Sequence, residues 1–152
     1  MTRESQSERV QCAAGRSGVE LLEAHFERHV YDRHMHDAYA IGITLRGVQR
    51  FWCRGATHDS TPGHVIVINP GDVHDGRSGS AGGYAYRMLY VNRDVIETSL
   101  EDVLEHHGEI GTPRPVLADP DLVRCVNAAW NAIATASNSL TADELLHRSL
   151  VS

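Results

Sequence analysis

Short runs rich in β-forming residues lie between residues 19 and 92, and most runs end near glycine, proline, asparagine or aspartate. A period of two places alternate side chains on opposite faces of a strand, and those end residues favour turns. The pattern predicts five strands, at residues 19–26, 38–45, 49–54, 64–68 and 84–91. Many short strands at such close spacing favour a β-sandwich or a β-barrel.

After residue 92 the spacing of apolar residues changes to that of helices. A short apolar pattern over residues 95–104 predicts a first helix. Asp119 and Pro120 supply an N-cap and a first helical residue for a second helix. The apolar stripe of this second helix consists of Leu122, Val126, Ala129, Trp130 and Ile133. Thr141 and Glu144 have the spacing of a capping box and predict a third helix.

The chain therefore divides into three parts. Residues 1–18 are polar and mixed in charge, and we expect a flexible N-terminal arm because such a segment buries too little apolar surface to offset its ordering entropy. Residues 19–92 form the predicted barrel. Residues 93–152 form a helical region that either covers the barrel or mediates dimerisation. The last helical pattern is still running at Ser152, so we expect an N-terminal domain excised from a longer protein.

Three histidines are spaced so that they can share one ligand. His34 and His36 occupy positions i and i+2, which face the same way on a strand, and His74 follows a tight turn after an apolar strand. Three neutral imidazoles that converge on one point suit Zn²⁺, Ni²⁺, Cu²⁺ or Fe²⁺. The alternative is that these histidines make hydrogen bonds or packing contacts at a strand edge. A metal site is thus one of two interpretations of the cluster.

The predicted strand at residues 38–45 indicates a hollow barrel. If His34 and His36 face inward, the same alternation turns small side chains inward, those of Ala38, Ala40, Gly42 and Thr44. The bulky side chains then point outward, namely Tyr39, Ile41, Ile43 and Leu45. Small inward groups leave room for a ligand, and the bulky outer face needs the cover that the helix of Trp130 can supply. The alternative is that larger side chains from facing strands fill the space.

Aromatic side chains are further candidates for ligand contact. Tyr84 and Tyr86 lie on one face of the predicted strand at residues 84–91, where phenol hydroxyls can orient a polar ligand. Trp52 can stack on a ligand, although the pattern does not fix its position relative to the barrel interior. Each ring can equally belong to the core. The candidate ligand-binding residues are His34, His36, Ala38, Ala40, Thr44, Trp52, His74, Tyr84 and Tyr86.

The charge balance makes nucleic acid an unexpected partner for this chain. Its 14 basic residues are all arginine, and 20 acidic residues outnumber them, which gives a net charge of −6. Nucleic-acid binding draws its affinity from clustered positive charge, whereas these arginines are scattered singly. We therefore expect the partner to be a small molecule or another protein.

The cysteines and the apolar segments indicate the compartment. Cys12, Cys53 and Cys125 are too few and too far apart for a disulfide framework or a Cys-x-x-Cys metal site. The N-terminus lacks the apolar run of a signal peptide, and no segment approaches 18 consecutive apolar residues. We expect a cytoplasmic protein that does not bind a membrane.

Three segments, at residues 36–47, 62–76 and 86–90, combine a characteristic spacing of histidine, glycine and proline with the strand sequence Tyr-Arg-Met-Leu-Tyr. Together they resemble the N-terminal effector-binding domain of AraC-family transcriptional regulators. The resemblance covers roughly residues 26–133. It implies a mainly β fold, a cupin-like double-stranded β-helix barrel followed by C-terminal α-helices.

The same resemblance implies a function and partners. Regulators of this family bind a small-molecule effector in the barrel and form homodimers through the helices. Their DNA is bound by a C-terminal helix-turn-helix domain, which here would lie beyond Ser152. The resemblance therefore implies a sensing and dimerisation domain that is not an enzyme, has no catalytic residues and needs no cofactor.

A stand-alone metal-dependent cupin enzyme, of the dioxygenase or isomerase type, is the rival hypothesis. It would use His34, His36 and His74 to hold Zn, Ni or Fe with an open coordination position. Metal-binding cupins carry a glutamate four or five residues after the second histidine, where this sequence has Ala40 and Ile41. The missing carboxylate favours the regulator.

Overall fold

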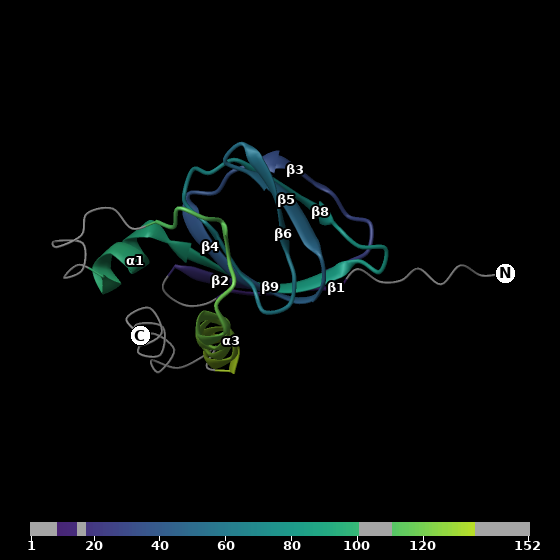
Figure 1. Cartoon of the computed structure of the whole chain (residues 1–152). Helices are drawn as coiled ribbons and strands as arrows, with labels where there is room; N and C mark the ends of the chain where they lie inside the picture. The colour runs from purple at the N-terminus through teal and green to yellow at the C-terminus, as the bar shows by residue number, and fades with distance from the viewer. Residues whose placement is uncertain (1–8, 15–17, 101–110, 136–152) are drawn as a thin grey trace.

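A computed structural model of the chain describes residues 9–14, 18–100 and 111–135, which form ten strands in two antiparallel sheets and two helices (Figure 1). The six-stranded sheet has the order β1 (Arg9–Ala14), β2 (Val19–Phe26), β9 (Tyr84–Asn92), β4 (Ala38–Gly47), β7 (Val65–Ile68) and β10 (Val116–Leu117). The four-stranded sheet has the order β3 (Tyr31–His34), β8 (His74–Ser78), β5 (Gln49–Cys53) and β6 (Ala56–Ser60). The helices are α1 (Arg93–Ser99) and α3 (Pro120–Thr135).

All five strands predicted from the sequence pattern are present. β2 has the predicted ends, and β4, β5, β7 and β9 agree to within two residues. The pattern missed β3, β6, β8 and β10. β3, β6 and β8 consist mostly of polar residues because the helices pack on the other sheet, so the outer face of the four-stranded sheet needs no apolar side chains.

The prediction of a flexible arm over residues 1–18 is wrong for part of that segment. Arg9–Ala14 forms β1, which pairs antiparallel with β2 from Arg9 opposite His25 to Ala14 opposite Glu20. Composition gave no sign of this strand because an edge strand is held by backbone hydrogen bonds to its neighbour, which any residue except proline can supply.

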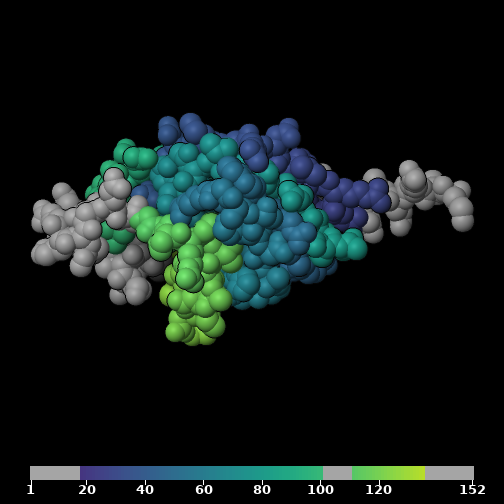
Figure 2. All heavy atoms as spheres, turned by 45° about the horizontal axis from the view of Figure 1, so that its top comes forward, coloured from purple at the N-terminus to yellow at the C-terminus, as the bar shows by residue number. Residues whose placement is uncertain are grey.

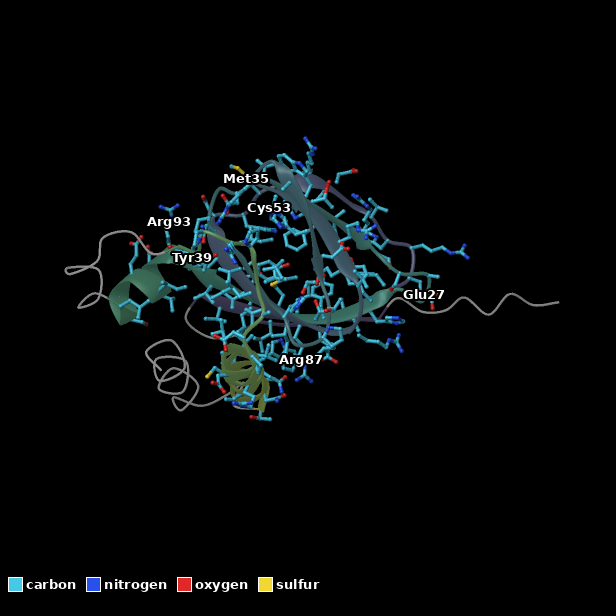
Figure 3. The ribbon with its side chains drawn as sticks, in the orientation of Figure 1. Glu27, Met35, Tyr39, Cys53, Arg87 and Arg93 are labelled. Atoms are coloured by element: carbon cyan, nitrogen blue, oxygen red, sulfur yellow. The ribbon has the colours of Figure 1, made fainter. Side chains whose placement is uncertain are left out.

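Buried side chains form two clusters on opposite faces of the six-stranded sheet. Ala40 belongs to the inner cluster between the two sheets, whereas Tyr39 and Ile43 belong to the outer cluster beneath the helices. The alternation predicted for residues 38–45 is therefore confirmed at these positions. Figure 3 shows the same division, with Cys53 between the sheets and Arg87 on the side of α3.

Helix α3 covers the outer face as predicted. Its N-terminus is capped by Asp119, whose Oδ1 accepts hydrogen bonds from the backbone N–H groups of Asp121 and Leu122 at 3.0 and 3.1 Å. The helix buries the side chains of Val126, Ala129, Trp130 and Ile133. In Figures 1 and 2 it forms a ridge on one side of the barrel, against β4, β7 and β9.

Two predicted helical segments are tested only in part. α1 begins two residues before the first predicted helix and ends inside it, at Ser99. Residues 101–104 of that prediction lie outside the described residues, as does the third helix predicted from Thr141. Among the described residues, no helix is long and apolar enough to cross a bilayer.

Candidate ligand-binding and metal site

The three histidines converge at one end of the barrel. His34 ends β3 and pairs with His74, the first residue of β8, while His36 follows two residues after β3. The ring centroids lie 4.3 Å apart for His34 and His74, 4.8 Å for His34 and His36, and 5.3 Å for His36 and His74. One nitrogen from each ring can be chosen so that all three lie within 4.8 Å of one another.

Two of these rings are fixed by backbone carbonyls. The Nδ1 atom of His34 lies 2.6 Å from the carbonyl oxygen of Asp32, and the Nδ1 atom of His74 lies 2.9 Å from that of Asp72. A carbonyl oxygen only accepts, so Nδ1 carries the proton in both rings. The Nε2 atoms of His34 and His74 therefore present lone pairs.

Burial favours the neutral forms of His36 and His74. It lowers the pKa of His36, and the neighbouring imidazole of His34 lowers it further, with Glu20 acting in the opposite direction. Burial likewise lowers the pKa of His74, although the hydrogen bond to the carbonyl of Asp72 raises it in part. Both rings favour the neutral form, the form in which an imidazole binds a metal.

A cavity of about 50 Å³ lies below the histidines, inside the barrel. It is lined by Tyr31, His34, Ala40, Gln49, Phe51, Ile66, Ile68, His74, Asp75, Gly76, Tyr86, Met88 and Tyr90. Gln49 is among these lining residues, and its side-chain oxygen is buried and without a hydrogen-bond partner among the described residues. A mostly apolar cavity with a few polar groups in its wall is the usual arrangement of a small-molecule site.

The interior is less hollow than the small residues of β4 suggested. Ala40 lines the cavity, but the space beside Gly42 is occupied by Met88, whose Sδ lies 2.6 Å from where a Cβ on Gly42 would be. Thr44 does not reach the cavity. Its hydroxyl lies 2.7 Å from that of the fully buried Ser60, so this threonine links two strands.

Aromatic rings form one wall of the cavity. The hydroxyl groups of Tyr31 and Tyr86 lie 3.4 Å apart, and burial raises the pKa of Tyr86 far above its ordinary value. Tyr86 thus stays protonated and can donate a hydrogen bond. Tyr84 stacks on Tyr86 with centroids 5.6 Å apart, but it is fully buried behind that ring and does not line the cavity.

A second, more open hollow of about 240 Å³ adjoins the histidines. It is lined by Glu20, His36, Asp37, Ala38, Tyr90 and Asn92. Ala38 and His36 thus belong to this outer hollow, and Tyr90 is common to both cavities.

Trp52 is not among the residues that line either cavity. Its neighbours Phe51 and Cys53 lie in the inner cluster, so alternation along β5 turns Trp52 to the other face. There the guanidinium of Arg33 lies over its ring, with Cζ 4.1 Å from the centroid. The backbone N–H of Trp52 donates a hydrogen bond to Asp75 at 2.7 Å.

Several lining residues were missing from the sequence-based set, among them Tyr31, Gln49, Phe51, Met88 and Tyr90. Met88 and Tyr90 share the strand face of Tyr86, so alternation along the predicted strand was a sufficient signal for both. For Gln49 and Phe51 the sequence did not show which side chains of β5 face the barrel interior. The pairing of β5 with β8 determines this.

The fold and this site agree with comparisons to known proteins. A family model described as the AraC-like ligand binding domain matches residues 16–150. The chain belongs to this family. Over 73 residues the AraC-like domain is 26% identical to the uncharacterized HTH-type transcriptional regulator YbfI of Bacillus subtilis (strain 168). That match covers 48% of this chain and 26% of YbfI, so the AraC-like domain matches about a quarter of that relative.

Solved cupin structures share the fold of this AraC-like domain. An RmlC-like cupin family protein with a double-stranded β-helix fold from Methanocaldococcus jannaschii matches with a TM-score of 0.53 at 11% identity, covering 60% of this chain and 86% of that one. A cupin superfamily protein from Desulfitobacterium hafniense DCB-2 matches with a TM-score of 0.52 at 11% identity, covering 60% and 84%. At this identity the likeness concerns the fold alone.

Proposed function

We propose that this AraC-like domain is the sensing half of a transcriptional regulator. It binds a small-molecule effector inside the barrel, forms a homodimer through its C-terminal helices, and controls DNA binding by a helix-turn-helix domain of the regulator. The observation that carries the proposal is the barrel cavity of about 50 Å³ with polar groups in its wall. Family membership supports ligand binding, and the match to an HTH-type regulator supports the regulatory role.

The cavity wall favours a small effector that donates hydrogen bonds. Gln49 offers a buried side-chain oxygen, and Tyr31 and Tyr86 offer hydroxyl groups. Asp75 is the charged residue among those that line the cavity, and no arginine of the described residues lines it. A carboxylate or phosphate would find no positive charge there, so we expect a neutral or cationic effector.

Strand β9 supports a route from the cavity to the helices. Tyr86 and Met88 face the cavity, while Arg87 between them faces α3 and contacts Asn127 and Trp130. If β9 can adopt two placements, an effector that binds more tightly to one of them would also favour the placement of α3 that fits it. The effector thus acts by shifting a population between two arrangements of barrel and helices.

A ligand screen tests the proposal. The chain is screened against small neutral and cationic polar compounds by thermal unfolding, and hits are confirmed by calorimetry. We expect at least one compound to raise the melting temperature of the chain and of Ala56→Phe, but not of Ala40→Phe, which fills the cavity. Ala56 is exposed and serves as the matched control. Circular dichroism verifies that both variants fold.

Two results would overturn this function. Binding that survives in a folded Ala40→Phe variant would place the effector outside the barrel. The complete gene is also sequenced. If it encodes no helix-turn-helix domain, the regulatory role is wrong.

Metal-dependent catalysis is a second candidate function, favoured by the convergence of His34, His36 and His74. The experiment that separates the two incubates the Zn²⁺- or Fe²⁺-supplemented chain with each compound found in the screen and follows it by mass spectrometry. An unchanged compound supports sensing. Conversion that disappears in His34→Ala would establish an enzyme instead.

A further inference from the structure

The open hollow beside the histidines is larger than the barrel cavity. The barrel cavity measures about 50 Å³ and the outer hollow about 240 Å³. Pockets for small molecules usually measure roughly 300–1,000 Å³, so the barrel cavity alone has room for only a small terminal group. Tyr90 lines both spaces, which therefore adjoin. A ligand that enters the barrel would have most of its volume in the outer hollow.

The six-stranded sheet continues its inner face from the cavity into this hollow. Tyr90 of β9 pairs with Glu20 of β2, and Asn92 of β9 pairs with Ala38 of β4. Residues that are paired across neighbouring strands share a face of the sheet, and Asn92 shares the face of Tyr90 by alternation. Three strands thus hold the polar groups of the hollow in fixed positions.

The hollow carries negative charge. Its lining includes the carboxylates of Glu20 and Asp37, and no described arginine contributes to it. Within the described part of the chain, neither carboxylate takes part in an ion pair. Two carboxylates next to the ring of Tyr90 attract a cation by Coulomb forces and by the ring face. A carboxylate or phosphate group would be repelled.

Two further polar groups of the lining are available to a ligand. Asn92 occupies the N-cap position of α1, where asparagine commonly accepts hydrogen bonds from the helix backbone, but its side chain makes no such bond. The Nε2 atom of His36 is buried and has no hydrogen-bond partner among the described residues. A polar ligand beside these groups would offset the cost of leaving them unpaired.

The carboxylates of the hollow do not belong to a metal site. Among the described residues the donor atoms that converge closely enough for one ion are those of three histidines, and neither Glu20 nor Asp37 is part of that group. A metal ion needs its ligands about 2 Å from itself, whereas an organic cation with several N–H donors can reach groups that lie farther apart.

We propose that the outer hollow binds the ammonium group of a small organic amine, whose opposite end, an uncharged polar group, enters the barrel cavity past Tyr90. A primary ammonium has three donors, which suits the two carboxylates and the amide oxygen of Asn92. The inference rests on the sensing function proposed above, because it names the chemical class of that effector and the place of its charge.

A matched series of compounds tests the charge requirement. The chain is titrated with hydroxyalkylamines, from aminopropanol to aminohexanol, and each amine is compared with the diol and the hydroxy acid of the same length. Binding is followed by the backbone amide signals in NMR spectra, which also locate the ligand. We expect saturable shifts of Glu20, Asp37 and Asn92 with at least one amine, weaker binding of its diol and no binding of its hydroxy acid.

Three variants test the carboxylates. Glu20→Gln and Asp37→Asn keep the size of each side chain and remove its charge, and both residues are exposed, so the fold should be retained. Asp121→Asn is the matched control, because it removes an exposed carboxylate from α3 on the other face of the sheet. We expect the affinity for the amine to fall about threefold or more in each hollow variant, about tenfold or more in their combination, and not at all in Asp121→Asn.

The outcomes separate this site from the sensing function. Absence of saturable amine binding, equal binding of amine and diol, or equal affinity in the folded hollow variants would overturn the ammonium site. An uncharged compound from the effector screen that binds in the barrel would then leave sensing intact. Conversely, amine binding that needs both carboxylates would support the site even if the complete gene encodes no helix-turn-helix domain.

Discussion

The guanidinium of Arg87 lies over the indole of Trp130, with Cζ 4.3 Å from the ring centroid. The same arginine pairs with Glu23 of β2 at 2.7 Å and donates hydrogen bonds to the side-chain oxygens of Asn127 and Asn131. One side chain of β9 therefore joins the sheet to α3 through charge, hydrogen bonds and a ring face.

Trp130→Ala should strongly destabilise the domain. Trp130 is 9% exposed and packs in the outer cluster, so its loss should lower the free energy of unfolding by about 3–5 kcal/mol. Urea unfolding followed by circular dichroism measures the change. Arg124→Ala, on the exposed side of the same helix, should change stability by less than about 0.5 kcal/mol. A small loss in Trp130→Ala would show that α3 is not docked as described.

Arg87→Met tests the junction between sheet and helix. Methionine keeps most of the apolar stem but removes the charge, so we expect a loss of about 1–3 kcal/mol in the free energy of unfolding. The matched control is Arg50→Met, because Arg50 also pairs with a carboxylate, that of Asp59, but at the exposed surface. It should change stability far less. Equal effects of the two substitutions would contradict a special role for Arg87.

Alternation made much of this fold predictable. It correctly placed Ala40 inward and Ile43 outward, and it assigned the helix of Trp130 as the cover, because small and bulky side chains alternate along β4 with the period of two of a strand. It failed for β1, a strand without a strong apolar pattern, and for Trp52, whose parity depends on pairing with a strand far away in sequence.

The site was predictable only in its local part. The spacing of His34 and His36, together with the turn before His74, was enough to bring three imidazoles together. The volume of the cavity was not, because it depends on how Met88 fills the space left by Gly42. Side-chain packing between distant strands leaves no trace in the pattern of one strand.

Gly42→Ala should destabilise the barrel, although in an ordinary strand alanine is more favourable than glycine. A Cβ at this position would lie 2.6 Å from the carbonyl oxygen of Arg87 and equally close to Sδ of Met88. Methionine can move, but the backbone of β9 cannot move freely, so we expect a loss of about 1–3 kcal/mol. Thermal and urea unfolding provide the measurement. Full rescue by Met88→Ala in the double variant would show that only the side chain obstructs the position.

Thr44→Val should lower stability without affecting ligand binding. The substitution leaves the hydroxyl of Ser60 buried without its partner, which costs about 1–3 kcal/mol. Adding Ser60→Ala removes the second polar group, so the double variant should recover part of that loss. Unfolding of the wild type, both single variants and the double variant in urea gives the coupling energy directly. Additive effects of the two substitutions would contradict the hydrogen bond. If Thr44→Val weakens the binding of a ligand found in the screen, Thr44 does contact the ligand.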